Sequence, residues 1–407
     1  MVLEKEEEIA CVNSHRNNNS QTLHFGDIET NYTFEKAKSV KRSADLVKHF
    51  LIQHDKKKTV HSKYTKMVLA VGDTQVEKLK KRSDEFIKLF PENKFIGKKE
   101  IGKYEPNVLK GRDKKENIAA FFSEDGYTID FQGLAKLFIT KTKKLDVMLG
   151  TKAEHIEKKE KAEGYVVHTT DKELHAKTVV VASGSHTLMI AKSLGYGEYI
   201  SLFCVAGSFY FVPKSLNGKV YTMQKEKLPF AAIHGDPDVY EGTKTRFGPT
   251  AKAVLLLERH RYKTFFEYVK TTGFKWRTFL SFVHINKDPI ILGYVLKNLL
   301  YDIPVFGKWL FLKEVRKVVP TTTYSELHYA KGYGGVRPQI VNDKTHTLDM
   351  GEAKFTGDNI IFNITPSPGA STCLRNAEDD AKKIVAFLGK SYTFDAKRFE
   401  KELVKGT

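Results

Sequence analysis

The segment DNIIFNITPSPGASTCLRNAEDDAKKIVAFLG, residues 358–389, decides the fold class. It starts with an apolar run typical of a buried strand, turns at Pro and Gly, and continues with the apolar spacing of a long helix. A strand, turn and helix start of this kind point backbone N–H groups at a ligand above the turn, preferably a negative one. Taken alone, the turn PSPGAS (366–371) is a good helix start, with a phosphate or another anion as a candidate ligand.

A second buried strand is predicted at TVVVASGSH (178–186), where a continuous β-branched run ends in Ser-Gly-Ser. This pattern is typical of a strand buried on both faces in a parallel sheet. Strand-like runs at 146–160 and 164–170 precede it in close succession. We therefore predict an α/β fold, α+β overall, in which a doubly wound layer carries an antiparallel excursion.

The middle of the chain has a different pattern. Residues 201–255 alternate apolar and polar side chains around Gly and Pro, which predicts a second, antiparallel sheet. Residues 255–318 are expected to be mainly helical. Charged residues and proline interrupt their most apolar part, 288–312, so it is not expected to span a bilayer. Nearer the amino end, helical spacing over 34–57 and 73–90 flanks a predicted strand at 64–72.

The chain is basic, with 67 Lys and Arg residues against 49 Asp and Glu residues and a formal net charge of +18. Lysine spread along the whole chain is typical of a solvated surface, or of one that meets anionic lipid. Nucleic-acid binding is not expected, because the basic residues are not interleaved with aromatic stacking platforms. Three cysteines lie far apart and match no metal-ligand spacing, which predicts a reducing compartment, no disulfide framework and no metal site.

Seven stretches resemble, in order, motifs of the malate:quinone oxidoreductase family. More distantly they resemble L-2-hydroxyglutarate dehydrogenase and other FAD enzymes built like D-amino-acid oxidase. The resemblance covers nearly the whole chain. The stretches are NSQTLHFGDIETNYT (19–33), TVVVASGSH (178–186), VAGSFYFVP (205–213), LPFAAIHGDPD (228–238), KTRFGPTA (244–251), GYGGVRPQI (332–340) and NITPSPGASTCL (363–374).

The chain departs from the family at its start. Family members begin with a strand, a Gly-x-Gly-x-x-Gly turn and a helix, then a second strand ending in an acid that binds the adenosine ribose. Here MVLEKEEEIA (1–10) matches that second strand, with Glu4 in the place of the acid and no Gly-x-Gly-x-x-Gly near it. The resemblance thus implies a Rossmann-like FAD-binding domain that lacks its first unit, because the sequence starts late or because the chain is naturally shortened.

The resemblance also implies a division of the chain. A discontinuous FAD-binding domain is expected beside a substrate domain that holds the antiparallel sheet and the helices, with a short tail at the end. The predicted ranges are 1–60, 130–200 and 325–395 for the FAD-binding domain, 61–129 and 201–324 for the substrate domain, and 396–407 for the tail.

By resemblance, the expected reaction is FAD-dependent oxidation of (S)-malate to oxaloacetate, with electrons passed to a membrane quinone. A related 2-hydroxy-acid enzyme, such as a 2-hydroxyglutarate dehydrogenase, or an oxidase that uses oxygen remains an alternative. A shortened, non-catalytic chain that binds no FAD and persists as a binding protein is another.

Malate oxidation needs groups that hold two carboxylates. Planar guanidinium groups suit carboxylates, and Arg246 and Arg337 stand in polar, glycine-containing contexts in a chain where Arg is scarce. A structural ion pair is the alternative for each. Gln339 is a candidate neutral donor to the substrate, or a surface residue.

The reaction also needs a base for the hydroxyl proton, and imidazole can take a proton near neutral pH. His24 and His234 are the candidates, and the family's motifs include a His at both positions. An ordinary buried histidine is the alternative for each. Asp236 is expected either to orient His234 or simply to form part of a Pro-containing turn.

The family's flavin contacts fall on three further segments of this sequence. One runs along the ring, one ends the buried strand near the nucleotide, and one faces the pyrimidine end of the ring, where negative charge develops on reduction. Together with Glu4, the candidate cofactor-binding residues are Asn19, Ser20, Gln21, Thr22, Ser183, Gly184, Ser367, Pro368, Gly369, Ala370 and Ser371.

Membrane association follows from the quinone acceptor that the resemblance implies. The expected location is peripheral, on the cytoplasmic face of a bacterial inner membrane or, alternatively, on the mitochondrial inner membrane. Within 289–318, aromatic residues beside lysine and arginine are a candidate lipid-facing surface, with an ordinary helix pair as the alternative. The apolar candidates are Tyr294, Phe306, Trp309, Leu310 and Phe311.

Overall fold

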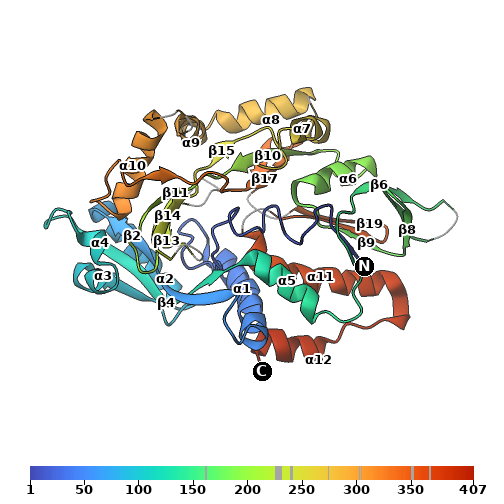
Figure 1. Ribbon diagram of the computed structural model, residues 1–407, viewed down its shortest axis with the longest axis horizontal. Coiled ribbons are helices and arrows are strands. Elements are labelled where there is room, and N and C mark those ends of the chain that lie inside the picture. The colour runs from blue at the N-terminus through green and yellow to red at the C-terminus, as the bar shows by residue number, and fades with distance from the viewer. Residues whose placement is uncertain are drawn as a thin grey trace.

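The computed structural model has helices on two sides of a set of sheets. In Figure 1, α7–α10 lie along the top and α1, α5, α11 and α12 along the bottom, with the sheets between them. The residues that the structure describes are 1–160, 163–224, 232–238, 242–273, 275–301, 303, 305–349, 353–365 and 368–407.

The largest sheet has eight strands, all antiparallel to their neighbours except for the parallel pair β12 and β2. In spatial order its strands are β16 (His328–Tyr329), β11 (Tyr210–Pro213), β14 (Lys244–Gly248), β13 (His234–Pro237), β12 (Lys219–Thr222), β2 (His61–Val71), β4 (Ile118–Ile129) and β3 (Lys94–Gly97).

Both faces of this sheet are covered, because side chains alternate along each strand. On β2, Met67 and Leu69 pack on one side, while Val68 and Ala70 pack on the other. The helices on the first side are α3 (Lys98–Tyr104), α4 (Pro106–Leu109) and α10 (Phe306–Val318), and those on the second side are α1 (Phe34–His54), α2 (Asp73–Phe86) and α5 (Phe131–Lys141).

A second, four-stranded antiparallel sheet stands beside the first. One face of β10, with Leu202 and Cys204, packs in the same core as α6 (Thr187–Ser193) and α7 (Thr264–Thr272). The other face, with Phe203 and Val205, packs against α9 (Pro289–Leu300). The strands, in order, are β15 (Lys252–Ala253), β10 (Ile200–Ala206), β17 (Val336–Asn342) and β18 (Thr347–Asp349).

The α/β layer is present as two parallel pairs. These are β1 (Val2–Leu3) with β5 (Val147–Met148), and β9 (Val179–Val181) with β20 (Ile360–Ile364). Strand β19 (Ala353–Gly357) is antiparallel to β20, and the excursion forms the antiparallel sheet β6 (Ala153–Lys158), β7 (Tyr165–Thr169) and β8 (Glu173–Ala176). Leu3 packs against the core that contains Val181 and Phe362, so the two pairs share their apolar contacts.

The remaining elements complete both layers. Helix α11 (Gly369–Leu388) packs on α1, where Arg42 forms a 3.1 Å ion pair with Glu378. Helix α8 (Trp276–Asn286) follows α7 along the top edge. The short helices are η1 (Gly184–His186), η2 (Gly389–Ser391), α12 (Ala396–Phe399) and η3 (Glu400–Lys405).

The elements predicted from periodicity are confirmed: the mixed fold, the helices near 34–57 and 73–90, the strand near 64–72 and the helical stretch after 255. Residues 201–255 do form antiparallel strands, but these strands divide between two sheets. Segment 325–342 contributes β16 and β17, which pair with β11 and β10. Within the described ranges, no helix is both long and apolar enough to cross a membrane.

Candidate active site

One face of the eight-stranded sheet gathers buried polar side chains at β12–β14. Residues two apart on a strand share a face, so Lys219 lies beside Tyr221 and His234 beside Asp236. The register places Tyr221 opposite His234, and Asp236 opposite Arg246. All five side chains are buried. The sheet therefore brings together His234 and Asp236, the predicted Arg246, and a lysine, Lys219.

Asp236 joins the two cations of this group. Its Oδ2 accepts from Arg246 Nη2 at 3.1 Å and from Lys219 Nζ at 3.3 Å. Burial alone would raise the pKa of Asp236, but the neighbouring Arg246, Lys219 and His234 outweigh it and hold the pKa below its usual range. Burial lowers the pKa of Lys219 against the pull of Asp236. A buried carboxylate held by two cations is expected to remain ionised.

His234 is neutral and correctly oriented to accept a proton. Its Nδ1 lies 3.1 Å from the carbonyl O of Ala232, which can only accept, so Nδ1 carries the hydrogen and Nε2 the lone pair. Burial lowers the pKa of His234 to about 3, although Asp236 opposes the shift. The ring stacks on Tyr221 with centroids 4.5 Å apart. Nε2 faces Asp236 Oδ1 at 3.6 Å.

The segment 19–24 lies against this group. Thr22 Oγ1 is 2.9 Å from the hydroxyl of Tyr221 and accepts from Lys219 Nζ at 3.0 Å. His24 is less enclosed: its Nδ1 pairs with Glu29, and its Nε2 is 3.4 Å from Ser20 Oγ. The two candidate bases are thus connected through Ser20, Thr22 and Lys219.

The same segment also contacts the start of α11. The backbone N–H of His24 donates to Ser371 Oγ at 2.9 Å, and the N–H of Ser371 donates to the carbonyl of Pro368 at 2.8 Å. Ala370 packs against the core that contains Leu23. The first turn of α11 contains no acidic residue, which leaves the positive end of its dipole available to a negative group. Segment 19–24 therefore lies between the polar group on β12–β14 and the amino end of α11.

Arg337 approaches from the four-stranded sheet. It is half-buried on β17, on the same face as the buried Gln339, and burial lowers its pKa. A Cβ placed on Gly207 would lie 3.1 Å from Arg337 Nη2 and 2.8 Å from Pro249 Cβ. The guanidinium of Arg246, three residues before Pro249, lies 4.7 Å from the ring centroid of Phe209. Both predicted arginines therefore border the 207–209 segment, one from each sheet.

Several buried polar atoms of this region make no hydrogen bond to any described residue. Buried polar groups in folded proteins are nearly always paired, so unpaired ones at one place indicate a ligand. The guanidinium of Arg337, too, makes no hydrogen bond or ion pair within the described part of the chain. The unpaired buried atoms are Arg246 Nε and Nη1, His234 Nε2, Asp236 Oδ1 and Gln21 Oε1.

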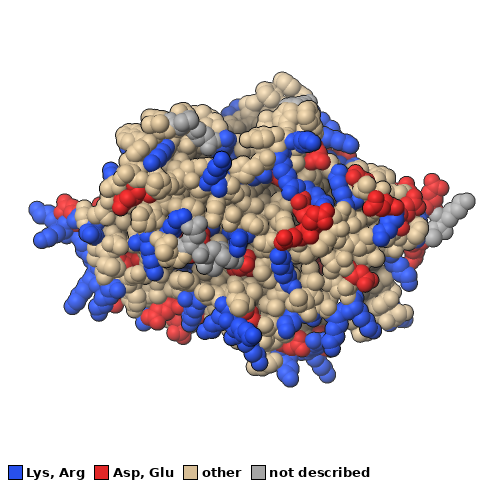
Figure 2. All heavy atoms as spheres, in the orientation of Figure 1, with Lys and Arg blue, Asp and Glu red and all other residues tan. Residues whose placement is uncertain are grey.

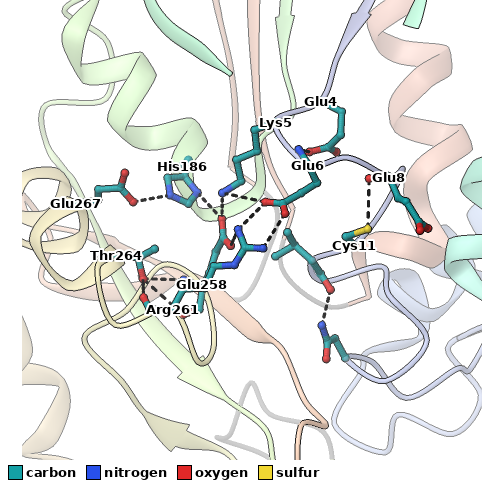
Figure 3. A network of polar contacts seen from close by, with 12 residues as sticks. Glu4, Lys5, Glu6, Glu8, Cys11, His186, Glu258, Arg261, Thr264 and Glu267 are labelled. Atoms are coloured by element: carbon teal, nitrogen blue, oxygen red, sulfur yellow. Dashed lines mark hydrogen bonds and ion pairs between the residues drawn. The ribbon is translucent and has the colours of Figure 1, made fainter. Parts of the chain in front are cut away.

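The predicted nucleotide end is organised by a separate polar network, shown in Figure 3. Glu4 follows β1, and its Oε1 accepts the N–H of Glu6 at 3.0 Å. Glu6 receives both terminal nitrogens of Arg261, at 2.5 and 2.7 Å, and Lys5 pairs with Glu258. His186 lies 3.5 Å from Glu258. The loop after β1 and the turn after β9 are thus joined through the loop that precedes α7.

The other predicted cofactor residues fall on turns. Ser183 and Gly184 follow β9 at the start of η1, and Ser183 Oγ lies 3.3 Å from Thr187 Oγ1. Asn19 Oδ1 accepts the N–H of Gln21 at 2.9 Å, so its side chain shapes its own loop. Ser367 lies outside the described residues.

A family model for malate:quinone oxidoreductase (Mqo) matches residues 1–379. The chain belongs to the malate:quinone oxidoreductase family. The family resemblance predicted from the motifs is therefore confirmed. Membership of the Mqo family implies a flavin cofactor.

Two relatives show how much of the length of a family member the chain covers. It is 42% identical to a probable malate:quinone oxidoreductase of Campylobacter jejuni, over 99% of this chain and 92% of that protein. It is 40% identical to the malate:quinone oxidoreductase of Helicobacter pylori, over 99% of this chain and 91% of that protein.

Solved structures support the fold. The chain is similar to glycine oxidase from Geobacillus kaustophilus, with a TM-score of 0.62 and 13% identity over 98% of this chain and 90% of that one. L-proline dehydrogenase from P. horikoshii gives a TM-score of 0.61 and 14% identity over 98% and 91%. L-alpha-glycerophosphate oxidase from Mycoplasma pneumoniae, solved with FAD bound, gives 0.60 and 13% over 94% and 87%. At these identities the likeness shows the fold alone, and the predicted fold class is confirmed.

Residues of this chain fit a flavin ring but not its whole nucleotide. Gln21 Oε1 makes no hydrogen bond to a described residue, and the first turn of α11, which segment 19–24 meets at Ser371, contains no acidic residue; both suit the polar edge of the ring. For the pyrophosphate, the family uses a Gly-x-Gly-x-x-Gly turn. The 407 residues contain no such turn, so no residue of this chain is assigned to the pyrophosphate.

Lys219 and Tyr221 were not predicted from the sequence. Both lie in a short strand, KVYT (219–222), and nothing in the adjacent sequence marks either residue as functional. The available signal was a lysine at an inward position of a strand, beside an acid on the neighbouring strand β13. Such a signal becomes visible only when the register of β12, β13 and β14 is known.

Proposed function

We propose that this chain oxidises (S)-malate to oxaloacetate, with FAD as cofactor and a membrane quinone as electron acceptor. The observation that carries the proposal is the buried group of Arg246, His234 and Asp236, whose unpaired polar atoms lie where segment 19–24 meets β12–β14. Family membership and the names of the Campylobacter and Helicobacter relatives agree with it.

The two arginines would hold the substrate's two carboxylates. Arg246 offers Nε and Nη1, two donors without a hydrogen bond to a described residue, although Nη1 lies 3.9 Å from Asp238 Oδ2. Arg337 offers a second guanidinium across the 207–209 segment. Gln339, two residues further on β17, is positioned to add a neutral donor. A dicarboxylate between two sheets would fix the orientation of the carbinol carbon.

His234 would take the hydroxyl proton at Nε2. Its lone pair points away from Ala232, and the imidazolium formed would be stabilised by Asp236 Oδ1, 3.6 Å away. Lys219 and Arg246 keep Asp236 ionised, so this stabilisation is present from the start. His24 is the second candidate for the base, with Glu29 in the orienting role. When bound, FAD would accept the hydride from the carbinol carbon.

The cofactor would be held by Gln21, Thr22 and the start of α11 at the ring, and by Ser183, Gly184 and Glu4 toward the nucleotide. The hydrogen bond from His24 to Ser371 supports this, because it brings two of these segments together. We also keep the predicted cofactor and substrate domains as a proposal. Because β17 pairs with β10, we assign residues 325–342 to the substrate domain.

A quinone acceptor implies a location at a membrane. We propose peripheral association with the cytoplasmic face of a bacterial inner membrane, which agrees with the bacterial origin of the relatives named above. Among the predicted lipid-facing residues, Phe306 and Trp309 are exposed. Phe311 is not: it is fully buried and stacks on Tyr210 with centroids 4.3 Å apart. Tyr294 and Leu310 pack against core clusters, so for these three residues the prediction is wrong.

The test begins with the absorption spectrum of the purified chain with and without added FAD. Bound oxidised flavin and malate-dependent reduction of a soluble dye are expected, with much slower turnover of 2-hydroxyglutarate. Arg246→Lys and Arg337→Lys should each raise the KM for malate about tenfold or more, because lysine cannot form the bidentate pair. Arg398→Lys, an exposed arginine paired with Glu402, is the control. A protein that stays colourless and inactive with FAD would support the non-catalytic alternative instead.

A further inference from the structure

Helices α7–α10 expose large apolar side chains along one edge of the molecule. They lie along the top of Figure 1, and in Figure 2 this edge is mostly tan, whereas lysine and arginine are frequent along the lower edge. Phe266, Trp276 and Val305 are 75%, 70% and 74% exposed. We call the outward faces of these four helices the α7–α10 surface. Exposure of so many large apolar side chains on neighbouring helices is unusual for a protein surrounded by water.

Helix α8 has its apolar side turned outward. Its exposed residues Trp276, Phe279 and Val283 follow a helical spacing, as do its buried residues, which are the polar Thr278 and Ser281 and the apolar Ile285. Surface helices of water-soluble proteins show the opposite arrangement, with the apolar stripe facing the core. The sequence of α8 is therefore suited to an apolar medium on its outer side.

Polar contacts attach α8 to the body. Thr278 Oγ1 and Ser281 Oγ both donate to the buried Asp343, at 3.0 Å each. Ser201 Oγ on β10 donates to the same carboxylate at 2.5 Å. The helix is thus held by hydrogen bonds while its apolar side chains stay available.

Helix α9 repeats this arrangement. Its one fully buried residue among those described is Asn298, whose Oδ1 accepts the N–H of Ala251 at 2.6 Å. Leu292, Leu296 and Leu299 are exposed. On the inner side, Tyr294 packs by Val205, and its hydroxyl interacts electrostatically with Arg337. Helix α9 therefore lies between the exposed surface and one of the proposed carboxylate-binding arginines.

The charges of this region favour an anionic partner. Residues 262–318 contain ten Lys and Arg residues against four Asp and Glu residues. Some cations stand directly beside the exposed aromatic rings: Lys313 Nζ lies 3.6 Å from the ring centroid of Trp309. A mixture of Trp, Phe and Leu with lysine is typical of segments that lie in the interface of an anionic bilayer. Two copies of the same surface, facing each other, would bring like charges together.

We propose that the α7–α10 surface docks on an anionic lipid bilayer, with α9 between the lipid and the candidate active site. Docking itself needs only this surface; the use of α9 as the side from which quinone is reached rests on the proposed function. The sequence indicated 289–318 alone. The structure adds α7 and α8, because these helices complete the same edge of the molecule.

The test measures co-flotation of the full chain with vesicles. One set contains phosphatidylethanolamine and phosphatidylglycerol, and the other contains phosphatidylcholine alone. Trp276→Ser, Phe279→Ser and Val283→Ser are combined in one variant, while Ile52→Ser with Ile87→Ser, two exposed apolar residues elsewhere, is the control. The wild-type chain should float with anionic vesicles, and binding should fall about tenfold or more in the triple variant but not in the control.

Two outcomes would overturn the proposal: a wild-type chain that does not float, or a triple variant that floats as well as the wild type. Self-association that the triple variant abolishes, without vesicle binding, would show an interface between copies instead. Malate-dependent reduction of a soluble dye is measured on the same preparations. Vesicle binding without dye reduction would refute the proposed function and leave docking intact, and the reverse result would refute docking alone.

Discussion

At the scale of single residues, His234 is the preferred candidate for the base. This histidine is fully buried and neutral. Since its Nδ1 donates to the carbonyl of Ala232, its Nε2 lone pair is the group that can accept a proton. Sequence motifs alone left His24 and His234 equal as candidates. The structure favours His234, because its Nε2 makes no hydrogen bond to a described residue, whereas Nδ1 of His24 pairs with Glu29 and its Nε2 lies 3.4 Å from Ser20 Oγ.

His234→Asn should lower kcat for malate about 10²–10⁴-fold, the usual contribution of a general base, with little change in KM. Since the pKa of His234 lies at about 3, the imidazole stays neutral down to mildly acidic pH. The wild-type rate should then show no loss attributable to this group between pH 8 and pH 5. The measurement is the pH profile of kcat/KM with a soluble acceptor. His24→Asn is the matched variant, and an equal or larger loss there would transfer the role to His24.

Glu105, between α3 and α4, provides a stability prediction far from the chemistry. Its carboxyl accepts the N–H of Gly218 at 2.6 Å and that of Asn217 at 3.0 Å. Burial raises the pKa of Glu105 to about 7 in spite of these donors, from 4.5 in an unfolded chain. Between these values the folded state keeps a proton that the unfolded state has lost. The stability it contributes is therefore full below about pH 4.5 and is lost as the pH rises to about 7.

Glu105→Gln should remove this pH dependence, because an amide resembles the protonated acid and cannot ionise. The wild-type free energy of unfolding should fall by about 3 kcal/mol from this group across that range, and the variant should be the more stable protein at pH 8. Urea unfolding at several pH values measures it. Glu124→Gln, at an exposed position, should leave the slope unchanged. A variant with the wild-type slope would contradict the assignment.

At the scale of elements, periodicity predicted the existence and type of most helices and strands, but not their partners. The alternation in 201–255 is real, yet nothing in it separates β10 from β11, which enter different sheets. Helix α8 shows the same limit. Its apolar stripe would ordinarily be assigned to the core, and only the contacts of Thr278 and Ser281 reveal that the stripe faces outward.

Asp343 should control how firmly α8 is attached. Asp343→Ala leaves the hydroxyls of Ser201, Thr278 and Ser281 without their shared acceptor, which is expected to cost about 2–3 kcal/mol. Because these hydrogen bonds connect α8 to β10 and to the end of β17, the loss should appear locally. Faster hydrogen exchange in the amides of α8 than in those of α1 is the expected result. Asp349→Ala, at an exposed position on β18, is the control, and uniform exchange in both variants would contradict the anchoring role.

At the scale of the whole molecule, long-range contacts connect the parts that sequence patterns describe separately. The candidate site draws on residues from 19 to 371, and no local pattern encodes the approach of Arg337 to the segment that precedes β11. Motif resemblance supplied the site residues that periodicity could not. It did not supply Lys219, because a buried cation that neutralises Asp236 is recognised only through three-dimensional pairing.

The network of Figure 3 makes the loop after β1 depend on the loop before α7, more than 250 residues away in the chain. Glu258 is its centre: the side chain is 5% exposed and is shared by Lys5, His186 and Arg261. Glu258→Ala should destabilise the protein by about 2 kcal/mol, less than a fully buried pair would, because Lys5 and Arg261 are partly exposed. The loss should be accompanied by faster hydrogen exchange in residues 4–8, since their link to the loop before α7 is weakened. Glu267→Ala removes only the more exposed partner of His186 and should cost less than about 1 kcal/mol. If Glu258→Ala unfolded in urea like the wild type and kept residues 4–8 protected, the amino-terminal loop would have to be held by its own contacts alone.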